Sequence, residues 1–86
     1  MHRVYFDTNE GDADGRYDLG IPGSMRDIAA AAAGLTPGTR VLLYMEDIEV
    51  EATLDWDAAH DQWWARPLWD TLRRLDVEIG SPAAAE

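Results

Sequence analysis

The stretch Asp47-Ile-Glu-Val-Glu-Ala-Thr-Leu-Asp-Trp56 alternates between polar and apolar residues at all ten positions. A period of two is that of a β-strand, because successive side chains of a strand point to opposite faces of the sheet. We therefore expect one face of this strand in the core and the other in water. The core face carries Ile48, Val50, Ala52, Leu54 and Trp56, and the wet face carries Asp47, Glu49, Glu51, Thr53 and Asp55.

The residues that follow this strand predict a hairpin. A four-residue loop, Ala58–Asp61, would set Trp56 opposite Trp63 and Leu54 opposite Ala65, so that both pairs lie in the core. A five-residue loop beginning one residue earlier would exchange the faces of the returning strand. The sequence leaves both registers open.

Trp64 must point away from Trp63, because neighbouring residues in a strand face opposite sides. With the four-residue loop, Trp64 shares the outer face with Gln62 and Arg66. Either the helix or the C-terminal segment covers it, or it is an exposed indole beside an arginine, which is typical of an interface hot spot. We expect Trp63→Ala to be strongly destabilising and an exposed Trp64→Ala to cost less than about 1 kcal/mol.

Shorter apolar alternations on both sides predict further strands. The first two, at residues 2–6 and 16–21, suggest a hairpin with a long polar loop. Two more are expected at residues 41–45 and 62–66, and residues 71–77 form either a last strand or a helical turn.

One helix is expected, at about Met25-Ala33. Ile21-Pro22-Gly23 breaks the preceding strand, and Ser24 is a typical N-cap residue. Gly34 then suits the residue that follows the helix. The helix is short, so it should lie on a sheet or close the end of a barrel.

These elements indicate an α+β protein that is mainly β: a small antiparallel barrel or strongly curved sheet of five to six strands with one short helix. The turn and apolar strand at Leu35-Thr-Pro-Gly-Thr-Arg-Val-Leu-Leu-Tyr44 resemble the corresponding entry of the Src-homology-like small β-barrels. That resemblance implies an architecture and no binding site. We expect one domain over residues 1–80 and a frayed tail over 81–86.

Composition excludes several kinds of chemistry. Cysteine is absent from the 86 residues, which removes disulfides, thiolate metal sites and cysteine nucleophiles. Seventeen acids against seven arginines and no lysine give a net charge of −10, which repels nucleic acids and anionic membranes. We therefore expect a protein partner, itself basic. The N-terminal residues have neither a signal-peptide nor a lipidation pattern, so a cytoplasmic location is expected.

The acidic loop Glu10–Asp18 holds the only candidate metal ligands, Asp12, Asp14 and Asp18. The Asp-x-Asp-Gly spacing within it is that of calcium loops, so a weak Ca²⁺ or Mg²⁺ site is one interpretation. The other is that the aspartates and glycines only shape a turn. No other cofactor is expected, and the sequence predicts no catalytic residue.

Three functions follow, in order of preference. The first is a non-catalytic acidic protein–protein interaction module that binds through Trp64, Arg66, Glu49 and Glu51. The second is an acidic mimic of nucleic acid that inhibits a DNA- or RNA-binding protein. It needs a free carboxylate row on the wet strand face, at about 6.6–6.8 Å per alternate residue, close to the roughly 7 Å between phosphates. The third is a hydrolase that uses a divalent metal in the acidic loop.

Overall fold

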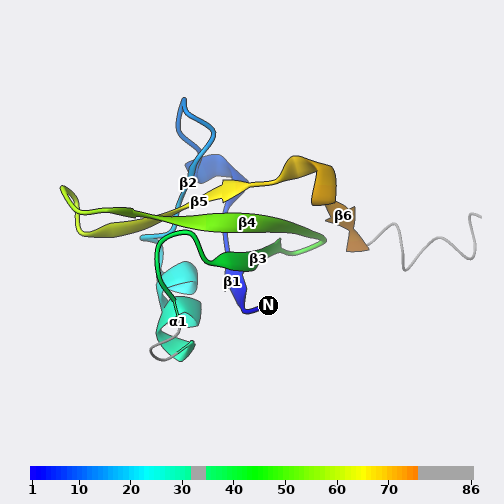
Figure 1. The fold of residues 1–86 in the computed structure, drawn as a ribbon. Coiled ribbons are helices and arrows are strands. Elements are labelled where there is room, and N and C mark those ends of the chain that lie inside the picture. Colours follow the sequence, from blue (N-terminus) through cyan, green and yellow to red (C-terminus); the bar gives the residue numbers. More distant parts are fainter. Residues whose placement is uncertain (32–34, 76–86) are drawn as a thin grey trace, which may run out of the picture.

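A computed structural model describes residues 1–31 and 35–75, which form a curled β-sheet with one α-helix beside it (Figure 1). The strands are β1 (Arg3–Tyr5), β2 (Tyr17–Asp18), β3 (Arg40–Met45), β4 (Ile48–Asp57), β5 (Gln62–Pro67) and β6 (Arg73–Arg74), and the helix is α1 (Pro22–Ala30). The described residues also form two short 3-10 helices, η1 (Thr8–Glu10) and η2 (Trp69–Thr71). The expected fold class is confirmed: the protein is mainly β, and the curled six-stranded sheet makes a half-barrel.

The central hairpin forms as the alternation predicts. β3, β4 and β5 pair antiparallel, with Trp56 opposite Trp63 and Leu54 opposite Ala65. This is the register of the four-residue loop. β6 pairs with the first residues of β4, beyond the part of β4 that pairs with β5.

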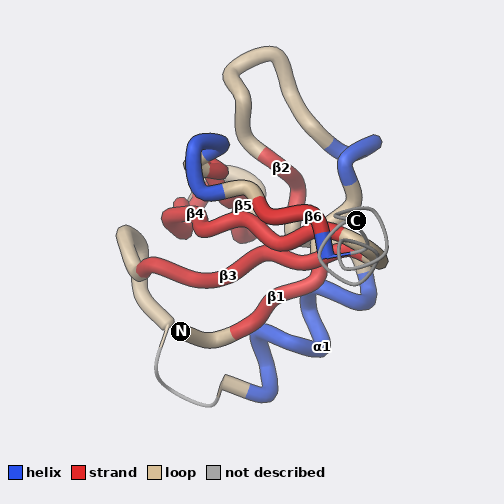
Figure 2. The backbone as a smooth tube through the Cα atoms, turned by 90° about the vertical axis from the view of Figure 1, so that its right-hand side faces the viewer, coloured by secondary structure: helices blue, strands red, loops and turns tan. Residues whose placement is uncertain are grey.

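The predicted pairing of the first two strands is wrong. β1 pairs parallel with β3, whereas β2 pairs antiparallel with β5, so the two strands lie at opposite ends of the order β1-β3-β4-β5-β2. The alternation identified both segments as extended, but period alone carries no information on the partner strand. The long polar loop between them passes from one end of the sheet to the other (Figure 2).

The core lies on the concave face of the sheet. Its buried apolar residues are Val4, Phe6, Leu19, Val41, Leu43, Val50, Ala52, Leu54 and Ala65. Trp56 was expected among them but has 39% of its surface exposed. Trp56 is placed at the end of β4 where the β4–β5 turn projects past the other strands, so it has few neighbours to cover it (Figure 1).

The helix begins earlier than predicted and has a different N-cap. Its N-cap residue is Ile21, which makes no side-chain cap, and Pro22 occupies the first turn. Ser24 is a residue of the helix itself and is fully buried, and its hydroxyl donates a hydrogen bond to the Tyr5 carbonyl. Ser24 therefore serves a tertiary contact. Residues 32–33 of the predicted helix, the end of the predicted 71–77 segment and the predicted tail lie outside the described residues.

The Ser24–Tyr5 hydrogen bond is one of three contacts, together called the clasp, that Ser24 and Asp27 of α1 make with Tyr5 and Tyr44. Through the clasp, α1 covers the free edge of β1 (Figure 2). The Tyr5 amide donates to Asp27 Oδ2 at 2.9 Å, while its carbonyl accepts from Ser24. The Tyr44 hydroxyl donates to the same carboxylate oxygen at 2.7 Å. Helix side chains thus take the place of a neighbouring strand, which blocks pairing with another chain at this edge.

Burial of Asp27 opposes its ionisation, but the hydrogen bonds from Tyr44 and Tyr5 outweigh that effect and lower the pKa of the carboxyl. The same bond raises the pKa of the Tyr44 hydroxyl, because it stabilises the protonated phenol. The clasp is therefore an ionised carboxylate held between a backbone amide and a phenol.

Candidate functional site

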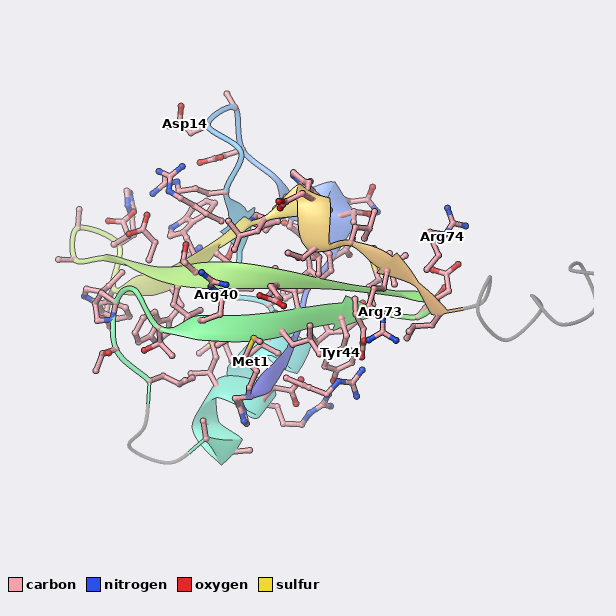
Figure 3. The ribbon with its side chains drawn as sticks, turned by 45° about the vertical axis from the view of Figure 1, so that its right-hand side comes forward. Met1, Asp14, Arg40, Tyr44, Arg73 and Arg74 are labelled. Carbon is pink, nitrogen blue, oxygen red and sulfur yellow. The ribbon has the colours of Figure 1, made fainter. Side chains whose placement is uncertain are left out.

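The acidic face of β4 is largely neutralised by arginines. Glu49 contacts Arg3 at 3.0 Å and Arg73 at 3.6 Å, and only 13% of its side chain is exposed. Glu51 contacts Arg40 at 2.9 Å. Arg40 and Arg73 lie at different points along this surface (Figure 3). Of the row of carboxylates predicted for nucleic-acid mimicry, Glu49, Glu51 and Asp55 are therefore paired with arginines.

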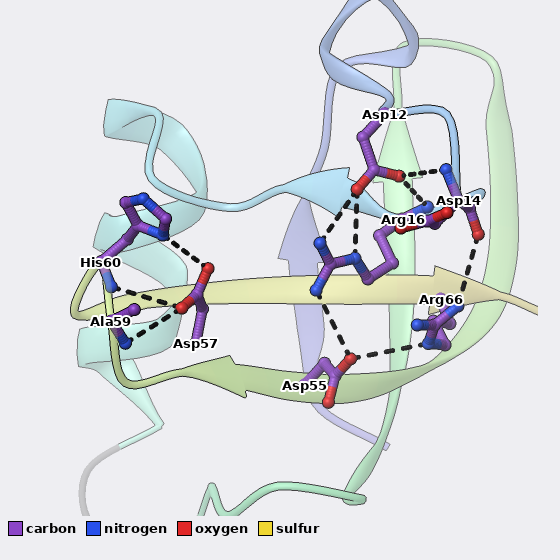
Figure 4. Close-up of polar contacts among 8 residues, drawn as sticks. All are labelled: Asp12, Asp14, Arg16, Asp55, Asp57, Ala59, His60 and Arg66. Atoms are coloured by element: carbon purple, nitrogen blue, oxygen red, sulfur yellow. Dashed lines mark hydrogen bonds and ion pairs between the residues drawn. The ribbon is translucent and has the colours of Figure 1, made fainter.

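Trp64 is half-buried, and the residue that covers it is Arg16. The Arg16 guanidinium lies 4.6 Å from the centre of the Trp64 ring and contacts Asp12 at 3.0 Å and Asp55 at 3.9 Å (Figure 4). Arg66 contacts Asp55 at 3.5 Å. The indole Nε1 of Trp64 is buried without a hydrogen-bond partner. The expected covers were the helix or the C-terminal segment, whereas the described residue over the ring is Arg16, from the acidic loop; residues 76–86 of the C-terminal segment lie outside the described residues.

The acidic loop uses its aspartates to hold its own shape. Asp12 accepts hydrogen bonds from the backbone amides of Arg16 at 2.8 Å and Asp14 at 3.0 Å. The amide and guanidinium of Arg16 lower the pKa of the Asp12 carboxyl despite its partial desolvation. Asp18 lies farther along and accepts from the Gly20 amide and from Gln62.

The carboxylates of Asp12 and Asp18 therefore have different partners, and Asp14 is exposed at the loop tip (Figure 3). Within residues 1–31 and 35–75, no group of three or more histidine or acidic side chains is arranged to hold a metal ion. The turn interpretation accounts for the contacts of Asp12 and Asp18.

The two histidines have separate structural contacts. His60 contacts Asp57 at 2.9 Å within the β4–β5 turn, and hydrogen bonds from His60 lower the pKa of the Asp57 carboxyl. His2 contacts the Asp27 carbonyl at 2.6 Å, at the start of β1.

An open pocket of about 480 Å³ lies between α1 and the end of the β4–β5 hairpin. Its walls include Met25, Ile28, Ala29, Trp56, Trp63 and Asp61. The Trp56 and Trp63 rings meet edge to face, with centroids 5.0 Å apart and planes at 65°. Exposed fractions of 57% for Met25 and 39% for Trp56 leave much apolar surface open to solvent.

Sequence reasoning missed this pocket because it placed both tryptophans in the core. Trp63 is half-buried and packs against the core, as expected, but Trp56 and Met25 remain open. The available signal was the position of Trp56 beside the turn, where a strand end has fewer neighbours. The depth of the pocket depends on how α1 docks, which no local pattern encodes.

A scan against models of protein families, a search of curated proteins and a search of solved structures found no match for the chain. In the part of the chain that the structure describes, no helix combines the length and the apolar character needed to cross a bilayer.

Proposed function

We propose that this protein is a non-catalytic, acidic interaction module that binds a basic segment of another protein, in the cytoplasm. The observation that carries the proposal is the open pocket bounded by Met25, Ile28, Trp56 and Trp63. A volume of about 480 Å³ falls within the range of about 300–1,000 Å³ that is usual for binding pockets.

The chemistry of the pocket walls supports binding of a protein segment. Tryptophan and methionine are enriched at protein interfaces, where exposed apolar area is released from water on binding. Met25 is also flexible and can adapt to the shape of an incoming side chain. The net charge of −10 favours a basic partner and accelerates its approach.

The outer face supports binding less well. Glu49 and Glu51 are paired with arginines, and Trp64 lies beneath Arg16. A partner there would have to break ion pairs before making new ones. Binding through Trp64, Arg66, Glu49 and Glu51 remains a prediction, and nucleic-acid mimicry gains no support from a neutralised carboxylate row.

The test compares capture of protein partners by the immobilised wild-type protein and by two variants. Trp56→Ala removes one wall of the pocket. Trp69→Ala is the matched control, because Trp69 is similarly exposed, at 43%, but packs against Tyr17 away from the pocket. We expect a partner that the wild type and Trp69→Ala capture equally and that Trp56→Ala captures at least fivefold less.

Circular dichroism and urea unfolding must first show that each variant is folded. Capture should also weaken as salt rises from 50 to 500 mM, since a basic partner is attracted by charge. If a third variant, Trp64→Ala, loses a partner that Trp56→Ala retains, the binding site lies on the outer face. Capture that neither Trp56→Ala nor Trp64→Ala changes would overturn the proposal.

A further inference from the structure

We infer that the pocket receives an arginine side chain of the partner, with its guanidinium against the Trp56–Trp63 corner and beside Asp61. This inference rests on the proposed function and specifies the ligand of the same site. It draws on a recurring contact within the protein itself and on the residues that line the pocket.

The protein holds a guanidinium between an aromatic ring and a carboxylate on its outer face. Arg3 lies 4.4 Å from the centre of the Tyr44 ring and contacts Glu49 at 3.0 Å. The ring attracts the cation through its negative face, and the carboxylate accepts hydrogen bonds from the edge of the guanidinium.

The same arrangement occurs at a second place. Arg16 lies 4.6 Å from the centre of the Trp64 ring and contacts Asp12 at 3.0 Å. In both examples the guanidinium lies over one aromatic ring and contacts at least one carboxylate, and Arg16 also contacts Asp55 at 3.9 Å.

The pocket supplies the same parts from two tryptophans and Asp61, and its described lining residues include no basic side chain. Because the two indole planes meet at 65°, they form two walls of a corner. Asp61 is the last residue of the turn, has a left-handed conformation with φ of 51°, and is the acidic residue among those that line the pocket.

The remaining walls suit the aliphatic part of an arginine. Met25 and Ile28 line the pocket from the helix side and can pack against the three methylene groups. Arginine fits better than lysine here, because a planar, weakly hydrated guanidinium stacks on indole and still donates to a carboxylate at its edge.

The experiment uses three nine-residue peptides, Gly-Ser-Lys-Ser-X-Ser-Lys-Ser-Gly, with X as arginine, citrulline or norleucine. Citrulline has nearly the shape of arginine without the charge, and norleucine keeps only an aliphatic chain. Affinities for the whole protein are measured by tryptophan fluorescence and calorimetry. We expect the arginine peptide to bind about three- to tenfold more tightly than the citrulline peptide, and both more tightly than norleucine.

Two variants assign that preference to residues. Trp56→Ala should abolish it, and Asp61→Asn should reduce it at least twofold. Asparagine tolerates positive φ as well as aspartate does, so this change removes the charge with little strain. The control Trp69→Ala should leave the affinities of all three peptides unchanged.

Equal affinity for the three peptides would overturn the inference and leave the proposed function standing, since the pocket would then bind a segment without choosing its cation. Absence of binding for all three up to 5 mM would also overturn it, whereas the capture experiment decides the proposed function separately. An arginine preference that survives Trp56→Ala would place the arginine site elsewhere and refute the assignment.

Discussion

Removal of the Asp27 carboxylate should destabilise the fold more than removal of any exposed carboxylate of β4. Asp27 Oδ2 accepts hydrogen bonds from the Tyr5 amide at 2.9 Å and the Tyr44 hydroxyl at 2.7 Å, and its side chain is 18% exposed. Hydrogen bonds to charged groups contribute about 1.5–3 kcal/mol each. The higher helix propensity of alanine offsets about 0.5 kcal/mol of that loss.

The two bonds together amount to about 3–6 kcal/mol, so with this offset we expect Asp27→Ala to lower the free energy of unfolding by about 2.5–5.5 kcal/mol. We expect Asp27→Asn to lower it by about 1–2 kcal/mol. Asparagine can keep one neutral acceptor, which explains the smaller loss. These are large fractions of the stability of about 4–13 kcal/mol usual for a chain of this length. With a urea dependence of about 1 kcal/mol/M, the Asp27→Ala midpoint should fall by at least about 2.5 M.

The pH dependence gives an independent check. The pKa of Asp27 is lower in the folded than in the unfolded protein, so its charge stabilises the fold above about pH 4. That contribution is lost as the pH falls through the folded-state pKa. The difference in the free energy of unfolding between wild type and Asp27→Asn should therefore be constant from pH 5 to 7 and shrink below pH 4.

Glu51→Gln is the matched control, because Glu51 pairs with Arg40 at the surface and such pairs contribute at most about 1 kcal/mol. Urea unfolding followed by tryptophan fluorescence measures all the variants. Equal urea midpoints for Asp27→Ala and Glu51→Gln would refute a stabilising role of the clasp. A difference in the free energy of unfolding between wild type and Asp27→Asn that does not shrink below pH 4 would also refute it.

Three further variants test the packing by the same urea assay. Trp63→Ala should lower the free energy of unfolding by about 3 kcal/mol, because Trp63 packs on the core. Trp64→Ala should lower it by about 1–2 kcal/mol, because Arg16 covers the ring. A larger loss for Trp64→Ala than for Trp63→Ala would contradict the observed register. Gly23→Ala should cost about 1–2 kcal/mol, since a Cβ there would lie 2.8 Å from the Tyr5 ring, and an increase in stability would show that the ring moves freely.

The chemistry of the candidate sites was only partly readable from the sequence. The acidic loop was recognised, and Asp12 has the turn role that its Asp-x-Asp-Gly spacing also allowed. The pocket at Trp56 was not found, because its walls come from a helix and a hairpin that are far apart along the chain. The cover over Trp64 was not found either, since Arg16 lies just before β2, which is brought beside Trp64 by its long-range pairing with β5.

The sequence by itself determined that β4 is a strand and that a hairpin follows it. Strict alternation over Asp47–Trp56 defines which side chains of β4 share a face, because successive side chains of a strand point to opposite sides. The sequence left two loop lengths open, and the structure selected the one that sets Trp56 opposite Trp63. The expectation of a curved, mainly β fold with one helix rested on the same local signals and is confirmed.

Only the tertiary structure decided which strands meet at the edges and what each outer residue touches. β1 pairs with β3 and is covered by α1, so Ser24 bonds to Tyr5 where local propensity predicted an N-cap. A buried strand edge must satisfy its amides and carbonyls, and that requirement outweighs the roughly 1 kcal/mol available from a helix cap. Contacts between distant segments depend on such competition between whole elements, which no short stretch of sequence contains.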